Sequence, residues 1–262
     1  MASAAGRGSP PLAAYVLHSY DWSESSLIVD LFTRTQGRVV VVAKGAKRPT
    51  SGFRPLLLPF HPLAVWLSRT AADEQGEVKS LRAAEWGGGV PLPAAALMSG
   101  FYLNELLLKG LARQDPHALL YDAYAETLAV LAAAPGADLG ADTEAVALRA
   151  FELVLLRELG WLPALDRVTA SAEPLDAQRR YTLQAETGLV PDSGGAHGAT
   201  WVALQAVLAQ GSLAELRQAC AVEASALRTP LRHLVHYHLA TSQLRTRRLN
   251  LQLQRLAAQP ER

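Results

Sequence analysis

The sequence contains a single cysteine, Cys220, among its 262 residues. An internal disulfide framework is therefore excluded, and so is a zinc site built from paired cysteines, because no Cys-x-x-Cys pair occurs. Cys220 lies among Leu216, Ala219 and Val222, which predicts a small buried side chain and not a nucleophile. A chain without disulfides fits a reducing compartment, so we expect a cytoplasmic protein.

Long apolar runs are also missing. No uninterrupted apolar segment approaches the roughly 18 residues that a membrane span requires. The first eleven residues are Ala, Gly, Ser and Pro with one Arg after Met1, and they lack the apolar stretch of a signal peptide. We expect residues 1–11 to form a frayed tail.

Sequence motifs for catalysis are absent as well. The chain has no P-loop, no Gly-x-Ser-x-Gly, no His-Glu-x-x-His and no persuasive pair of carboxylates. His233, His236 and His238 resemble a metal cluster, but only the first two share a helical face and no carboxylate is near in sequence. We therefore expect a protein that is not an enzyme and holds no metal or cofactor.

Acidic residues are missing from one long window. No Asp or Glu occurs between Leu31 and Ala72, whereas seven cations do: Arg34, Arg38, Lys44, Lys47, Arg48, Arg54 and Arg69. The net charge of +1 hides this asymmetry. Residues 1–90 hold ten Lys and Arg against seven Asp and Glu, residues 91–223 hold eight against sixteen, and residues 224–262 hold seven against one. Two basic ends around an acidic middle indicate separate binding surfaces.

Four consecutive valines lie within this window, in the segment from Gly37 to Pro49. β-Branched side chains fit a pleated surface, so Arg38–Ala43 is predicted as a buried strand that leads into a basic loop. Further short strands are expected between turn signals, at Ala13–Ser19, Ser26–Thr33, Leu56–Phe60, Leu63–Ser68 and Glu77–Ala84. Five or six such strands predict a small closed barrel over residues 12–86.

The composition changes at residues 87–93, where three glycines and two prolines predict a linker. Residues 94–262 are predicted to be a helical domain, which makes the chain an α+β protein. Helices are expected over Ala94–Ala112, from Asp115-Pro116 to about Ala133, from Asp142 or Thr143 to Gly160, and from Thr229-Pro230 onward. Residues 161–200 are rich in Pro and Gly and form an excursion with short strands near Tyr181–Leu183 and Gly188–Val190.

Several stretches, in order along the chain, resemble the bacterial RecO family of recombination mediators. They are Gly37–Pro49; Phe101–Leu108 with Asp115–His117 and Leu120–Tyr124; Arg149–Leu153 with Leu159-Gly160 and Leu165–Arg167; and Leu231–Leu239 with Leu244–Arg247. The resemblance implies an OB-fold at the N-terminus followed by a helical domain. It also implies annealing of single strands and loading of recombinase on DNA coated by single-strand-binding protein, in the RecFOR pathway at the nucleoid. The implied partners are single- and double-stranded DNA, the RecR ring and the acidic C-terminal tail of the coating protein.

One departure concerns a four-cysteine zinc ribbon that many members of that family carry. Val168 and Ser171 stand where its first cysteine pair would be, and Leu189–Gly194 supplies no second pair. We expect the excursion to keep the shape of the ribbon without metal.

The acid-free window supplies the candidate DNA contacts. Cations in a barrel groove hold the phosphate backbone and aromatic side chains stack on bases. We expect DNA contacts from Arg34, Arg38, Lys44, Lys47, Arg48 and Arg54, although a charge run is also compatible with a solvated turn. The aromatic candidates are Tyr20, Trp22, Phe32, Phe53, Phe60 and Trp66, of which Phe53, between Gly52 and Arg54, is the expected stacking residue.

Two further sets of cations have open interpretations. Arg228–Arg255 holds six arginines and no acid, with Arg245 and Arg248 on one helical face, and is either a second DNA surface or an ordinary exposed face. Lys109, Arg149 and Arg157 lie on otherwise apolar helices, where long cationic side chains often extend to solvent. The family's binding of the coating protein's tail suggests instead that these three meet its carboxylate. A protein-interaction adaptor with an incidentally basic barrel is the alternative function.

Overall fold

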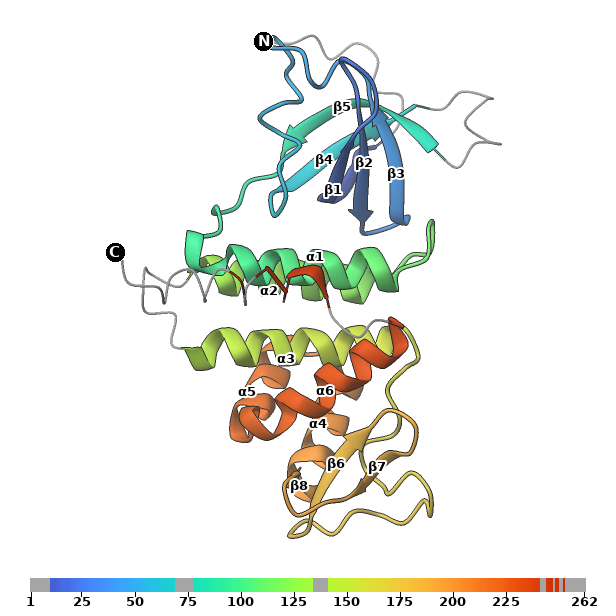
Figure 1. The fold of residues 1–262 in the computed structure, drawn as a ribbon, viewed down its shortest axis with the longest axis vertical. Helices are drawn as coiled ribbons and strands as arrows, with labels where there is room; N and C mark the ends of the chain where they lie inside the picture. The colour runs from blue at the N-terminus through green and yellow to red at the C-terminus, as the bar shows by residue number, and fades with distance from the viewer. Residues whose placement is uncertain are drawn as a thin grey trace. The chain divides into compact units, whose positions relative to one another are not determined.

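The computed structural model describes residues 10–68, 78–133, 141–240, 244–246, 248, 249 and 252 (Figure 1). The chain divides into two compact units. The first comprises Met1–Leu92 and Leu103–Ala125, and the second comprises Pro93–Tyr102 and Glu126–Arg262. The sequence predicted a boundary at the 87–93 linker, and the units differ from that division because Leu103–Ala125 joins the barrel.

The first unit is built around a closed barrel of five strands in the order β1-β2-β3-β5-β4. The strands are β1 (Leu12–Asp21), β2 (Leu27–Thr33), β3 (Gly37–Ala43), β4 (Pro62–Leu67) and β5 (Val78–Trp86). β3 pairs antiparallel with β2 and parallel with β5, and this second pairing closes the barrel. The N-terminal barrel followed by helices confirms the predicted OB-fold architecture.

The valine run occupies the centre of the barrel. Val39, Val41 and Ala43 are almost fully buried in the barrel core, together with Val29 and Leu31 of β2. Val40, on the opposite side of the pleat, is also buried. Because β3 is covered on both sides over this stretch, a continuous apolar run replaces the alternation of a half-exposed strand.

Residues 103–125 cover one end of this barrel. Gly37, in the β2–β3 turn, has φ of +65°, and a Cβ there would lie 1.9 Å from the carbonyl oxygen of Asp115. Only glycine permits both that conformation and that approach. The Asp115 segment joins the two helices α1 (Leu97–Gly110) and α2 (Ala118–Ala133), so the β2–β3 end of the barrel is closed off.

Asn104 of α1 fixes the same segment to an irregularity in β1. The β1–β2 register shifts between Val16 and His18. The Asn104 Nδ2 donates to the carbonyl oxygen of Leu17 at 2.9 Å, and the Tyr124 hydroxyl donates to Asn104 Oδ1 at 2.5 Å. A buried amide thus satisfies a strand carbonyl at a bulge, where the ladder cannot do so.

The second unit combines helices with a small sheet. α3 (Ala141–Glu158) packs against α5 (Leu213–Val222) and α6 (Ala224–His238), and α4 (Gly198–Gln210) packs against α5. A short 3-10 turn, η1 (Ala94–Ala96), precedes α1. The excursion forms a three-stranded sheet in the order β7-β6-β8, from β6 (Arg180–Gln184), β7 (Gly188–Pro191) and β8 (Ala196–His197). The two strands expected here are confirmed, and β8 was not anticipated.

Three predicted elements were wrong in detail. Leu56–Phe60 forms turns and not a strand: the Leu56 and Leu57 amides donate to the Phe53 carbonyl, and Phe60 has φ of +72°. α2 begins at Ala118 and not at Asp115-Pro116. α6 begins at Ala224, with Pro230 inside it, because burial of Leu227, Pro230 and Leu231 keeps the segment helical despite the missing amide.

Candidate nucleic-acid interface

The basic loop, Lys44–Arg54, leaves β3 at the barrel end opposite the β2–β3 turn (Figure 1). Its backbone folds into consecutive turns. The Arg48 amide donates to the Gly45 carbonyl at 3.1 Å, the Ser51 amide to Arg48 at 3.0 Å and the Arg54 amide to Ser51 at 3.3 Å. These bonds hold the loop in a defined shape, so its cations are carried on an ordered backbone.

The hairpin turn between β1 and β2, Trp22–Ser26, is bonded directly to the basic loop. The Lys47 amide donates to the Ser25 carbonyl at 3.0 Å, and the Gly45 amide donates to Ser26 Oγ at 3.4 Å. The Lys47 Nζ also donates to the Ser23 carbonyl at 3.0 Å. The hairpin turn and the basic loop therefore form one surface at this end of the barrel.

The cations of this surface differ in their surroundings. Lys44, Arg48 and Arg54 are exposed. Lys47 is only about one-third exposed, and its Nζ lies 3.2 Å from Asp21 Oδ1 at the end of β1. Asp21 precedes the acid-free window in the sequence, but the fold brings it to the basic loop, where it offsets part of the positive charge.

Arg34 and Arg38 have intramolecular partners instead. Arg38 is largely buried, donates to Asp30 Oδ1 at 2.8 Å and donates to the Leu108 carbonyl at 2.7 Å. Arg34 makes two 2.8 Å bonds to the carboxylate of Asp122 in α2. Both arginines join the barrel to residues 103–125, so we leave them out of the proposed DNA surface.

The aromatic candidates for base stacking differ in their exposure. Phe53 is partly buried and packs against the barrel core, whereas Phe32, Phe60 and Trp66 are buried. The exposed rings near the basic loop belong to Tyr20 and Trp22, which are 45% and 65% exposed. Its position between Gly52 and Arg54 favoured Phe53 in the sequence, but its packing against the core arises only on folding.

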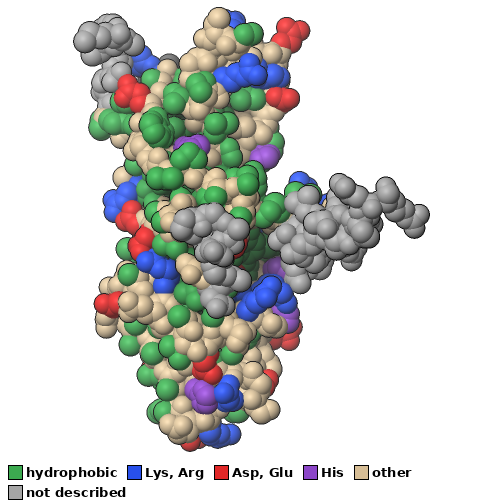
Figure 2. All heavy atoms as spheres, turned by 90° about the vertical axis from the view of Figure 1, so that its left-hand side faces the viewer, with side chains coloured by type: hydrophobic (Ala, Val, Ile, Leu, Met, Phe, Trp, Pro, Cys, Tyr) green, Lys and Arg blue, Asp and Glu red, His purple; other side chains and the backbone are tan. Residues whose placement is uncertain are grey.

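Two of the C-terminal arginines, Arg245 and Arg248, are exposed. The Arg248 amide donates to the carbonyl of the buried Leu244 with helical spacing. Arg69, Arg247 and Arg255 lie outside the described residues. Figure 2 shows one face of the molecule, on which Lys and Arg side chains lie in separate groups with Asp and Glu beside several of them.

A small cationic cavity lies within the second unit. It has a volume of about 160 Å³ and is lined by Met98, Ser99, Tyr102, Leu148, Arg149, Arg228, Arg232, His236, Leu244 and Thr246. Three cations therefore line the cavity, those of Arg149, Arg228 and Arg232. Such a cavity has the size and charge to hold a carboxylate.

A fully buried carboxylate, Glu152, orients Arg149. The Arg149 Nη2 donates to Glu152 Oε1 at 2.6 Å, and the Tyr102 hydroxyl donates to the same oxygen at 2.5 Å. Burial raises the pKa of Glu152, against the opposing influence of Arg149 and of the Tyr102 hydrogen bond. Arg149 Nε finds no hydrogen-bond partner among the described residues, although the side chain is over nine-tenths buried.

The two other cations expected beside Arg149 have different positions. Lys109, in the first unit, lies 3.7 Å from Glu105 one turn away, and Arg157 is exposed in the last turn of α3. The arginines that line the cavity with Arg149 are Arg228 and Arg232. Their spacing in the sequence places them on one face of a helix in an acid-free stretch, and this was the signal that could have found them.

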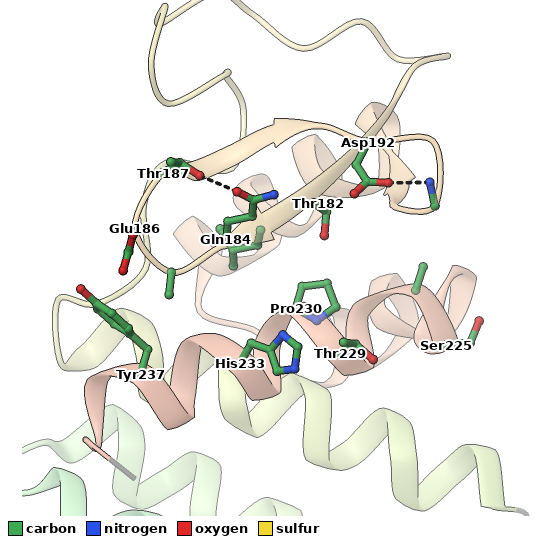
Figure 3. A pocket seen from close by; sticks show the side chains of 14 residues that line it. Thr182, Gln184, Glu186, Thr187, Asp192, Ser225, Thr229, Pro230, His233 and Tyr237 are labelled. Carbon is green, nitrogen blue, oxygen red and sulfur yellow. Dashed lines mark hydrogen bonds between the residues drawn. The ribbon is translucent and has the colours of Figure 1, made fainter. Parts of the chain in front are cut away.

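A larger cavity, about 640 Å³, lies between the β6–β7 turn and α6 (Figure 3). Thr182 and Gln184 line it from β6, and Thr229 and His233 line it from α6. Its described lining contains the carboxylates of Glu186 and Asp192 but neither Lys nor Arg. The cavity is therefore unsuited to a phosphate backbone.

Within the part of the chain that the structure describes, no three His, Cys, Asp or Glu side chains are grouped so as to bind a metal ion. No described helix has the length and apolar character to span a membrane.

Comparison with known proteins identifies the family. Residues 12–87 match the family model for the N-terminal part of recombination protein O, and residues 94–248 match the model for its C-terminal part. The chain is 50% identical over 249 residues to the DNA repair protein RecO of Polaromonas naphthalenivorans, covering 93% of this chain and 96% of that relative. It is 49% identical over 264 residues to the DNA repair protein RecO of Delftia acidovorans, covering 98% of this chain and all of that relative. The chain, with its N-terminal barrel and helical second unit, therefore belongs to the RecO family of DNA repair proteins.

Proposed function

We propose that this protein is a DNA-binding recombination mediator. It anneals complementary single strands and promotes recombinase loading on DNA coated by single-strand-binding protein. The observation that carries the proposal is the basic loop, which is bonded to the hairpin turn at the barrel end opposite the β2–β3 turn. Family membership supports a role in DNA repair, and we place the protein in the cytoplasm at the nucleoid.

The basic loop acts on phosphates. Two single strands repel each other through their backbones, and annealing requires that this charge be neutralised while the bases stay accessible. Lys44, Arg48 and Arg54 are exposed and supply such neutralisation without reading sequence. No covalent chemistry is required of the protein.

Reversal of charge in the basic loop tests this function. Changing Lys44, Lys47 and Arg48 together to Glu is expected to abolish oligonucleotide binding, because phosphates would meet three carboxylates. Fluorescence anisotropy at low salt measures the affinity, and circular dichroism checks that the fold is retained.

A single substitution makes the test quantitative. Arg48→Gln should flatten the slope of log affinity against log salt by about 0.7 for a single strand, as expected for one lost phosphate contact. Arg179→Gln, at an exposed position in the second unit, removes the same charge and should leave the slope unchanged. Unaltered affinity in the triple variant would refute the assignment.

Asp21→Asn should act in the opposite direction. It frees the Lys47 Nζ from its 3.2 Å ion pair and removes a carboxylate that repels phosphate. We expect single-strand affinity to rise roughly 2- to 5-fold at low salt, the scale of an exposed ion pair. The same anisotropy assay measures the gain, and weaker binding in this variant would show that phosphates do not approach Lys47.

We further propose that the cavity around Arg149 binds the C-terminal tail of single-strand-binding protein, and that RecR is a partner. The tail offers a terminal carboxylate, which suits the three arginines at the cavity. The apolar side chains of Met98, Leu148 and Leu244 also line the cavity and suit an apolar last residue.

This pocket is also the feature that favours the alternative function, an adaptor that binds partner tails. A shallow salt slope for DNA would support that alternative.

Arg232→Ala tests the tail pocket. It spares Arg149, whose loss would leave Glu152 buried without its cation. Affinity for an acidic peptide with an apolar C-terminal residue should fall about 10-fold or more, since a charged hydrogen bond contributes about 1.5–3 kcal/mol. Arg157→Ala, in the last turn of α3, is the matched control. The same peptide with an amidated C-terminus should bind weakly to the wild type and equally weakly to Arg232→Ala; full binding of the amide would contradict the proposed carboxylate contact.

A further inference from the structure

Trp22 is the most exposed aromatic side chain at the barrel end that carries the basic loop. Its side chain is 65% exposed, although it directly follows β1. An indole left in water at this position contributes little to the barrel core. It is, however, a flat apolar surface of the kind on which a nucleobase stacks.

The backbone that carries Trp22 is held firmly. The Trp22 amide donates to the Ser26 carbonyl at 3.3 Å, and the Ser26 amide donates to Ser23 Oγ at 3.2 Å. The bond between the Lys47 amide and the Ser25 carbonyl ties the same turn to the basic loop. A platform on such a turn is pre-organised, so little conformational entropy is lost when a ligand binds.

A cation is bonded to the backbone next to Trp22. The Lys47 Nζ donates to the carbonyl of Ser23, the residue that follows Trp22. One nucleotide can contact both groups, since its base has a flat face that stacks on the indole and its phosphate carries the charge that the ammonium binds. The Asp21 carboxylate also lies 3.2 Å from the Lys47 Nζ, so a phosphate competes with Asp21 for this ammonium, while Lys44, Arg48 and Arg54 are exposed to it.

The other aromatic side chains of the first unit are less suitable. The Tyr20 ring is contacted edge-on by His18, with centroids 4.4 Å apart. Phe53 packs against the core. Trp86 is 60% exposed, but it ends β5 opposite Leu63 of β4, whereas Trp22 lies in the turn that is hydrogen-bonded to the basic loop.

We propose that Trp22 stacks on an unpaired nucleobase and thereby makes this surface select single strands over duplex. The proposal rests on the proposed DNA-binding function and deepens it. In a duplex, both faces of each internal base are already stacked, so the indole gains a partner only if a base pair opens. Phosphate contacts at the basic loop are available from either form. Trp22 therefore supplies the difference between the two substrates.

The test compares three probes of equal length: a single strand of thymidines, a duplex, and a single strand of abasic sites that keeps the phosphates. Anisotropy is measured for the wild type and for Trp22→Ala, Trp22→Phe and Trp86→Ala. Trp22→Ala should weaken binding to the thymidine strand roughly 5-fold or more, the scale of one stacked base. It should leave duplex and abasic-strand affinity unchanged. Trp22→Phe should keep most of the affinity, and Trp86→Ala should match the wild type.

The possible failures are distinguishable. Equal losses on all three probes, or no loss on any, would overturn the stacking role while leaving the DNA-binding function in place. A wild type that binds none of the probes at low salt would overturn the proposed function itself, and the role of Trp22 with it.

Discussion

The candidate interface depends on the hydrogen bonds between the Trp22–Ser26 turn and the basic loop. Three of them converge on Lys47 and Gly45, two from backbone amides and one from the Lys47 ammonium. Without them, the basic loop would be a flexible chain of charges whose ordering would consume part of the free energy of binding. With them, cations and an exposed indole share one ordered surface, as the proposed combination of phosphate binding and base stacking requires.

The opposite end of the barrel explains why this surface lies where it does. Gly37 allows the Asp115 segment to pack directly on the β2–β3 turn, and Arg34 and Arg38 hold residues 103–125 through Asp122 and the Leu108 carbonyl. That end is thereby used for internal packing. Two arginines of the acid-free window serve the fold, and the cations beyond β3 remain accessible. A single run of positive charge in the sequence is thus divided between internal ion pairs and exposed side chains.

The sequence predicted the barrel because its signals were local: four valines in β3, the Thr35–Gly37 turn and regular strand spacing. The sequence-based prediction failed where contacts between residues distant in the sequence determine the local structure. The strand expected at Leu56–Phe60 is replaced by turns that are bonded to Phe53. Pro230, at the expected start of the last helix, lies inside α6 because its neighbours are buried. The partners of Arg34 and Arg38 are brought close only by folding, since Asp122 is 88 residues from Arg34. The Arg149–Glu152 ion pair, in contrast, has i,i+3 spacing, so it could be predicted from the sequence. The position of Arg149 beside Arg228 and Arg232 could not be predicted, because it depends on how two helices pack.

Annealing of complementary oligonucleotides, both coated with single-strand-binding protein, tests the central claim that the basic end of the barrel pairs DNA strands. The rate of duplex formation would be followed by fluorescence energy transfer between labelled strands, with and without this protein, over a range of salt. The account predicts that the wild type accelerates annealing of the coated strands and that the acceleration falls steeply as salt rises, because phosphate contacts are screened. An absence of acceleration at low salt, or an acceleration that salt leaves unchanged, would contradict it.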